Sequence, residues 1–152
     1  MNQDETAAVR VAPLHGGAPF ADELIVKYLL VRNDLASLNP GKGFAQSDHA
    51  GTQMILKDMP GWSPEHQAWV HRWAEDGDGF GTVLAMGVSE RTMLRALDIA
   101  ARLGVPHATI RDKSYPLQDG ETLHLIPLIT CAYIFGPKVL IENATKHLDL
   151  HA

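Results

Sequence analysis

The order of apolar and polar residues along the chain predicts four strands that alternate with helices. Residues 23–32 read Glu-Leu-Ile-Val-Lys-Tyr-Leu-Leu-Val-Arg, an apolar run that is typical of a central strand covered on both faces. Further strands are expected at 82–86, 107–111 and 122–135, with a loop over 112–120 after the third strand. This alternation predicts an α/β fold of three layers, in which helices flank a four-stranded, mixed but mostly parallel sheet.

Helix signals fill the gaps between these strands. A helix is expected over 42–57, and Ser63 followed by Pro64 starts the next one with a capping hydroxyl and a proline at the first helical position. Ser89 opens a third helix, and Gly104 ends it. The residues of the first helix that we expect to face inward are Phe44, Ala45, Ala50, Met54 and Ile55.

Composition and charge narrow the class of protein. The 152 residues are 45% hydrophobic and 20% charged, which fits one globular domain. We assign residues 1–22 to a flexible tail and 23–152 to the domain. No apolar stretch is long enough to cross a membrane, and no signal peptide is apparent, so we expect a cytoplasmic protein. The net charge of −5 requires any nucleic-acid site to gather its basic residues on one face.

Three residues that could carry chemistry have a plainer interpretation. Cys131 is the only cysteine and lies in the apolar run 126–133, so we interpret it as a small buried hydrophobe rather than a nucleophile. Trp69 and Trp73 are spaced i, i+4 and should share one face of their helix. We favour core packing over base stacking for this pair.

Polar residues with chemical potential gather on the first predicted helix. Lys42, Gln46 and His49 are spaced i, i+4 and i+7, and therefore share one face. Lys42 falls in the first turn, where free backbone N–H groups already favour an anion. Gln46 can donate and accept hydrogen bonds, and His49 can also move a proton. The solvated face of any surface helix has the same pattern, so spacing alone leaves both interpretations open.

Asp112 is the second candidate. It follows the strand predicted at 107–111, at the edge of the sheet where open α/β folds bind ligands. A carboxylate at this point could act as a base or orient one. An aspartate that only opens a turn is the plainer alternative.

Several segments, in order, resemble the type 2 peptidyl-tRNA hydrolase family. Residues 31–35, Val-Arg-Asn-Asp-Leu, match the end of its first strand. Residues 41–50 match its most distinctive motif, a Gly-Lys entry into a helix that carries Ala-Gln and His-Ala. Residues 144–150, Ala-Thr-Lys-His-Leu-Asp-Leu, are similar to its Val-Thr-Gly-His-Leu-Lys-Leu tail. The family's Asp-Ala-Gly loop, closely followed by a threonine, is here Asp-Lys-Ser-Tyr-Pro at 112–116.

The resemblance implies hydrolysis of the ester between a peptide and the 3′ end of a tRNA, with water as nucleophile and without a metal or organic cofactor. Lys42 would then stabilise the negative charge, and Asp112 would orient or deprotonate the water. Gln46 would position the substrate or a bridging water, and His49 would support Lys42 and Gln46. Ser114 would supply a hydroxyl in place of the threonine. The basic residues that would hold the tRNA backbone are Arg32, Arg111 and Lys113. The resemblance also permits a homodimer.

Two other functions stay open. The altered loop and the net charge of −5 favour a non-catalytic relative that binds a nucleotide, an RNA end or another anion. A hydrolase of a different small ester or amide, with its pocket reshaped by Tyr115 and Pro116, is the third possibility. The enzymatic interpretations share one requirement, which is that the side chains of Lys42 and Asp112 converge on one cleft.

Overall fold

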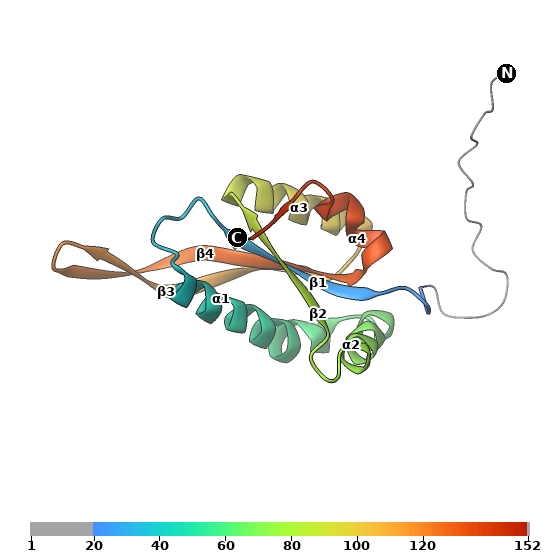
Figure 1. The fold of residues 1–152 in the computed structure, drawn as a ribbon. Coiled ribbons are helices and arrows are strands. Elements are labelled where there is room, and N and C mark those ends of the chain that lie inside the picture. Colours follow the sequence, from blue (N-terminus) through green and yellow to red (C-terminus); the bar gives the residue numbers. More distant parts are fainter. Residues whose placement is uncertain (1–19, 152) are drawn as a thin grey trace, which may run out of the picture.

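A computed structural model describes residues 20–151, in which a five-stranded sheet lies between two pairs of helices (Figure 1). The elements in chain order are β1 (Ile25–Arg32), α1 (Pro40–Thr52), α2 (Pro64–Asp76), β2 (Thr82–Val88), α3 (Glu90–Leu103), β3 (His107–Asp119), β4 (Thr122–Pro137), α4 (Lys138–Thr145) and β5 (Asp149–Leu150). After α1 the chain continues through a π-helical turn, Gln53–Asp58, and a 3₁₀ turn, Met59–Gly61. None of the helices in this part of the chain is long and apolar enough to cross a membrane.

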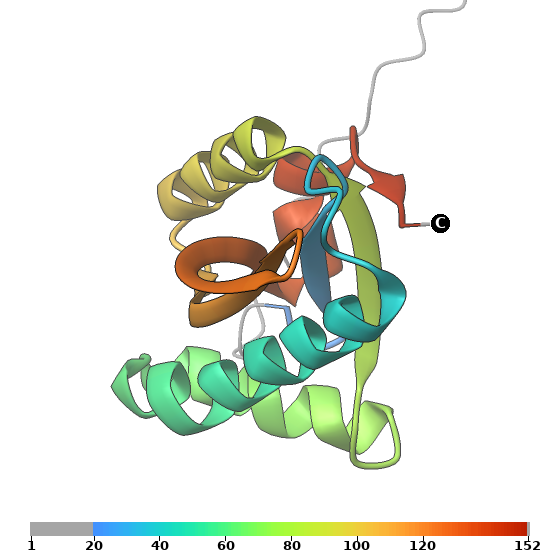
Figure 2. The same cartoon turned by 90° about the vertical axis from the view of Figure 1, so that its left-hand side faces the viewer.

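The layers agree with the predicted α/β class. Helices α1 and α2 cover one face of the sheet, and α3 and α4 cover the other, as the end-on view makes plain (Figure 2). Residues 1–19 of the expected tail lie outside the described residues. Residues 20–22 form a turn in which the Phe20 ring meets Trp69 edge-on, at 6.4 Å between centroids.

Strand β1 is the centre of the core. All of its residues are buried, as its mostly apolar sequence predicts, and Lys27 and Arg32 are buried with the rest. It pairs in parallel with β2 and antiparallel with β4. The order of strands in the sheet is β3-β4-β1-β2-β5, so β3 lies at one edge.

The prediction of a four-stranded, mostly parallel sheet is wrong. Only β1 and β2 form a parallel pair, and β4 pairs antiparallel with both β1 and β3. The error arises at residues 112–120, where a loop was expected but β3 continues to Asp119. A two-residue turn with Gly120 at φ 56° then returns the chain as β4. A glycine with positive φ favours such a tight hairpin turn, so β3 and β4 become neighbours without a crossover.

The β3–β4 hairpin nevertheless lies at the end of the sheet where the loop over 112–120 was predicted. Strands β1 and β3 both run antiparallel to β4, and they therefore point in the same direction. The far half of β3 consequently lies beyond the same end of the sheet at which β1 gives way to α1. Figure 1 shows the hairpin projecting from this end, beside the first turns of α1.

The helix signals are confirmed. The side chains of Asn39, Ser63 and Ser89 cap α1, α2 and α3, and Gly104 ends α3 in a left-handed conformation at φ 70°. Trp69 and Trp73 of α2 are buried, as predicted. In α3, Met93, Ala96, Leu97 and Ala100 are buried, and Leu103 is partly buried.

The inward face of α1 is predicted only in part. Ala50 and Met54 are buried, but Phe44 is 77% exposed and Ala45 is also exposed. The inward position one turn before Ala50 belongs to Gln46, which is 4% exposed. A buried amide is stable only where hydrogen-bond partners are provided, and these partners lead to the candidate site.

Candidate active site

Lys42 lies in the first turn of α1, against the β3–β4 hairpin. The Asn39 side chain accepts a hydrogen bond from the Lys42 backbone N–H at 2.9 Å, which fixes the start of the helix. The Lys42 ammonium donates to the backbone carbonyl of Pro116 at 2.8 Å. It also lies over the ring of Tyr115, with Nζ 4.9 Å from the centroid. The hairpin therefore holds this charge through a carbonyl and an aromatic face, both of which attract cations.

Gln46 joins the helix to two strands. Its Nε2 donates to Oδ2 of Asp112 in β3 at 2.8 Å, and its Oε1 accepts from the hydroxyl of Thr130 in β4 at 2.6 Å. The Thr130 contact is buried and the Asp112 contact is partly buried, so the amide is bonded at both ends. Its orientation is therefore set by the fold rather than by solvent.

Asp112 is half-buried and lies in β3, not in a loop as predicted. The register shifts between Asp112 and Tyr115, which marks a β-bulge. In a regular strand, residues three apart, such as Asp112 and Tyr115, would face opposite sides of the sheet. Here both reach the α1 side, Asp112 to Gln46 and Tyr115 to Lys42. The second carboxylate oxygen, Oδ1, accepts from the Ser114 backbone N–H at 2.9 Å.

Lys42 and Asp112 consequently lie on the same side of the molecule. Lys42 contacts Pro116, and Gln46, one turn further along α1, contacts Asp112. The helix and the strand thus meet through two successive contacts, with the ammonium in one and the carboxylate in the other. The two side chains therefore lie at the same contact between α1 and β3. That they converge on one cleft stays a prediction. We refer to Lys42, Gln46 and Asp112 as the Lys42 site.

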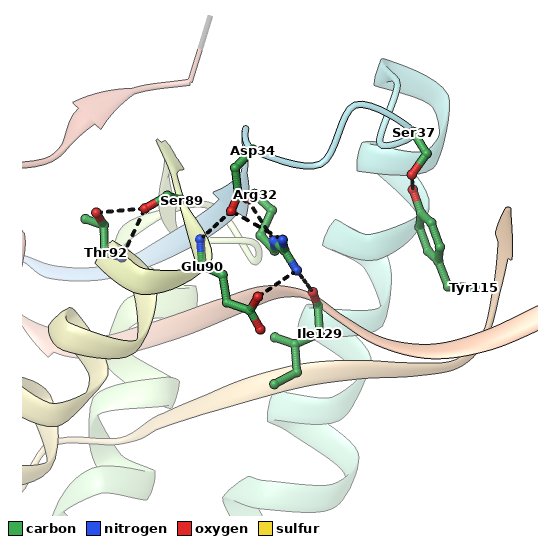
Figure 3. Close-up of polar contacts among 8 residues, drawn as sticks. All are labelled: Arg32, Asp34, Ser37, Ser89, Glu90, Thr92, Tyr115 and Ile129. Atoms are coloured by element: carbon green, nitrogen blue, oxygen red, sulfur yellow. Dashed lines mark hydrogen bonds and ion pairs between the residues drawn. The ribbon is translucent and has the colours of Figure 1, made fainter.

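Arg32 belongs to a different cluster, shown in Figure 3. Its guanidinium pairs with Asp34 at 2.9 Å and with Glu90 at 3.2 Å, and it donates to the Ile129 carbonyl at 3.2 Å. The hydrogen bond with Asp34 is the main cause that raises the pKa of Arg32, and it likewise lowers the pKa of Asp34. We call Arg32, Asp34 and Glu90 the Arg32 cluster. Its cation is 9% exposed and matched by two carboxylates.

The other predicted residues are exposed. His49 lies on the surface of α1, and within residues 20–151 no hydrogen bond joins it to the Lys42 site. Arg111, Lys113 and Ser114 are exposed on β3. Ser114 contributes its backbone N–H to Asp112 rather than its hydroxyl, so the substitution of this hydroxyl for a threonine stays a prediction.

Sequence reasoning missed Thr130 and Ser37, and it named Tyr115 only as a residue that reshapes the pocket, not as a support for Lys42. Thr130 orients Gln46, Tyr115 lies under Lys42, and Ser37 bonds the Tyr115 hydroxyl at 3.1 Å (Figure 3). A signal was present for Thr130, since a polar residue inside the apolar run 126–135 needs a buried partner. The bulge that turns Tyr115 toward α1 left no comparable signal.

Two further features border the site, and one of them touches it, since the Cys131 thiol donates to the Gln46 backbone carbonyl at 3.5 Å. A pocket of about 420 Å³ opens on the other flank of α1, toward β2, and its lining includes Val31, Gly43, Phe44 and Ala85. Cys131 is fully buried, as predicted, and its burial raises the pKa of the thiol to about 12. A thiol that stays protonated at neutral pH is a poor nucleophile.

The chain is similar to a known protein family, to a relative in sequence and to a solved structure in fold. The model of the family described as "Peptidyl-tRNA hydrolase PTH2" matches residues 25–151. A peptidyl-tRNA hydrolase from Thermococcus onnurineus is 30% identical over 128 residues, which cover 80% of this chain and 93% of the relative. A solved structure of a protein of unknown function from Agrobacterium tumefaciens overlaps 84% of this chain and 98% of its own, at 11% identity and a TM-score of 0.47. This last resemblance is too distant to bear on function.

Proposed function

Given that this chain belongs to the peptidyl-tRNA hydrolase PTH2 family, we propose that it hydrolyses the ester that joins a peptide to the 3′ end of a tRNA. The observation that carries the proposal is the meeting of Lys42, Gln46 and Asp112 at the contact between α1 and β3. An ammonium and a carboxylate share one region there without forming an ion pair with each other.

The proposed chemistry is the addition of water to the ester carbonyl. Asp112 accepts a proton from the water as its oxygen attacks the carbonyl carbon. The carbonyl oxygen then carries a negative charge, which the Lys42 ammonium stabilises. When the bond to the ribose 3′ oxygen breaks, that oxygen takes up the proton from Asp112, the peptide leaves with a free carboxyl group, and the free tRNA departs. An ammonium has three donors and one of them serves Pro116, so two are left for the substrate.

Gln46 has a supporting role in this proposal. Its amide fixes one oxygen of Asp112 and is itself fixed by Thr130. The carboxylate is therefore oriented before substrate binds, and less reorganisation is needed during the reaction. The exposed imidazole of His49 lies one turn further along α1. In this proposal it contacts the substrate and does not orient Asp112.

The tRNA backbone would be held by exposed basic residues near the site. Arg111 and Lys113 flank Asp112 in β3, and their exposed side chains are free to meet phosphates. For Arg32 we propose a structural role instead, because its guanidinium is already bonded to two carboxylates and a carbonyl. No metal or organic cofactor is part of the proposed reaction.

The direct test is the release of tRNA from a labelled peptidyl-tRNA by purified protein. We expect turnover by the wild type and a loss of at least about a hundredfold in Lys42→Ala, the size seen when one stabilising donor is removed from an oxyanion site. Lys138→Ala, which changes an exposed lysine at the start of α4, is the matched control and should keep full activity. A wild type that releases no tRNA would rule out the proposed activity.

One observation favours the non-catalytic alternative. The Lys42 ammonium already donates to the Pro116 carbonyl, and this contact comes from the segment in which the chain departs from the family's loop. A relative that only binds RNA would show salt-sensitive association with tRNA and no release of the peptide. Titration of tRNA binding against salt, alongside the turnover assay, separates the two functions.

A further inference from the structure

We infer that Tyr115 is a positioning residue that holds the Lys42 ammonium in place for catalysis. The inference rests on the proposed function, and it concerns the part of the chain where the family's loop is replaced by the β3–β4 hairpin. Tyr115 would not touch the ester. It would act through Lys42, by keeping a flexible four-carbon side chain in one orientation.

The contacts of Tyr115 are those of a support anchored on both sides. Its ring is fully buried and lies under the Lys42 ammonium, with Nζ 4.9 Å from the centroid. Its hydroxyl bonds Ser37, in the segment that leads from β1 into α1, at 3.1 Å (Figure 3). The next residue, Pro116, offers its carbonyl to the same ammonium at 2.8 Å. Two consecutive residues of the hairpin thus hold one cation.

The chemistry of these contacts suits a catalytic charge. A carbonyl and an aromatic face attract an ammonium, but neither carries a full negative charge. Lys42 therefore keeps its charge for the substrate, unlike Arg32, which faces two carboxylates. Free lysine side chains occupy many rotamers, and fixing them costs free energy that a preformed support removes from the catalytic step.

The β-bulge is what makes the support possible. It brings Tyr115 to the same side of β3 as Asp112, so one strand supplies both the carboxylate and the support for the ammonium. Proline at 116 cannot donate a backbone hydrogen bond, and its carbonyl is free to accept from Lys42.

Two substitutions of Tyr115 separate the ring from the hydroxyl. Tyr115→Phe keeps the ring under Lys42 and removes only the bond to Ser37, so kcat for tRNA release should fall less than about threefold. Tyr115→Leu removes the ring, and kcat should fall about tenfold with little change in KM. Loss of packing alone would lower the free energy of unfolding of Tyr115→Leu without lowering kcat per folded molecule, so both quantities are measured for each variant.

A second readout does not depend on turnover. The rate at which an amine-specific reagent labels Lys42, measured by mass spectrometry, should rise about tenfold in Tyr115→Leu and less than twofold in Tyr115→Phe. The exposed Lys138 serves as the reference within the same sample. Because Tyr115 is buried, Ser37→Ala provides a milder variant, which loses the same hydrogen bond without opening the core and should behave like Tyr115→Phe.

The outcomes decide between the inference and its alternatives. Unchanged labelling and unchanged kcat in a folded Tyr115→Leu protein would overturn it, and so would a faster enzyme, because the ring would then obstruct Lys42 rather than position it. If the wild type shows no turnover while labelling rises as expected, the support of Lys42 stands and the proposed hydrolysis falls.

Discussion

Two cations lie ten residues apart at the same end of the sheet, and the structure treats them in opposite ways. Arg32, the last residue of β1, is paired with Asp34 and Glu90. Lys42, in the first turn of α1, contacts a carbonyl and an aromatic ring. A cation matched by two carboxylates contributes to the fold and has little charge left to offer. A cation held only by neutral groups keeps its charge for another molecule.

The residue types fit this division. A guanidinium is planar and presents five donors, which allows Arg32 to bond Asp34, Glu90 and the Ile129 carbonyl together. An ammonium is a compact point charge with three donors and readily serves a transient anion. The two regions also touch the same strand, since Ile129 accepts from Arg32 and its neighbour Thr130 bonds Gln46. Single substitutions in each region can therefore show which one affects kcat and which one affects the free energy of unfolding.

The largest expected effect comes from the carboxylate of the Lys42 site. Asp112→Asn preserves the shape of the side chain and removes the base, so kcat for tRNA release should fall at least about a hundredfold. The free energy of unfolding should fall by only about 1 kcal/mol, because the amide oxygen can accept from Gln46 or from the Ser114 N–H but not from both. Asp58→Asn is a matched control, since Asp58 also accepts from a glutamine, Gln53, but lies away from the site. Equal losses in both variants would contradict the assignment.

Substitution in the Arg32 cluster should lower the stability of the protein and leave kcat nearly unchanged. Arg32→Met leaves Asp34 and Glu90 without their cation and should lower the free energy of unfolding by about 2 kcal/mol, the size of a hydrogen bond to a charged group. Urea denaturation measures this change, and kcat per folded molecule should stay within about twofold. Arg111→Met, at an exposed position, should change the stability by no more than about 0.5 kcal/mol. A selective loss of kcat in Arg32→Met would erase the distinction between the two cations.

An intermediate effect is expected from the hydroxyl that orients Gln46. Thr130→Val keeps the volume and leaves the Gln46 oxygen without its donor, so the amide can turn away from Asp112 and kcat should fall about tenfold. Thr145→Val is the matched control, because that buried hydroxyl bonds the Ile141 carbonyl in α4. Both variants should lose some stability, but only the first should lose kcat. Steady-state kinetics and thermal unfolding of the pair provide the comparison.

The smallest effect is a dependence of stability on pH. The Arg32 guanidinium lowers the pKa of Asp34 in the folded state below its ordinary value of 3.8. A group with a lowered folded pKa adds stability above its unfolded pKa and loses it as the pH falls. The difference in unfolding free energy between wild type and Asp34→Asn should therefore be constant at neutral pH and shrink below 3.8. A difference that grows toward acid would have the wrong sign.

The sequence predicts the helices and the buried strand β1 better than it predicts how the strands pair in the sheet. Helix starts at Ser63 and Ser89 and the buried strand β1 follow from local signals that involve neighbouring residues only. The continuation of β3 past Arg111 depends on pairing with β4, and Pro116 within it is an unfavourable residue for a strand interior. An edge strand tolerates this proline, and edge position is a property of the whole sheet.

The site was predicted for a reason that survives the error in topology. Asp112 was expected near Lys42 because both would follow the carboxyl ends of strands in a mostly parallel sheet, the edge at which such folds bind ligands. Strands β1 and β3 are separated by β4, yet they still point the same way, so the ends of both reach the same edge. The contact of Tyr115 with Lys42 and the role of Thr130 were not foreseen, because they depend on a bulge and on a partner from a distant helix. Gln46 was found from its spacing to Lys42, although its burial was not foreseen.

The central claim is that the ammonium of Lys42 and the carboxylate of Asp112 act on one substrate together. A double-mutant cycle on kcat/KM for tRNA release tests this most directly, with Lys42→Ala, Asp112→Asn and the combined variant. If the two groups work as a unit, the combined variant should be about as slow as the slower single variant, because either loss already disables the site. Losses that multiply in the combined variant would show two independent contributions and would contradict the account.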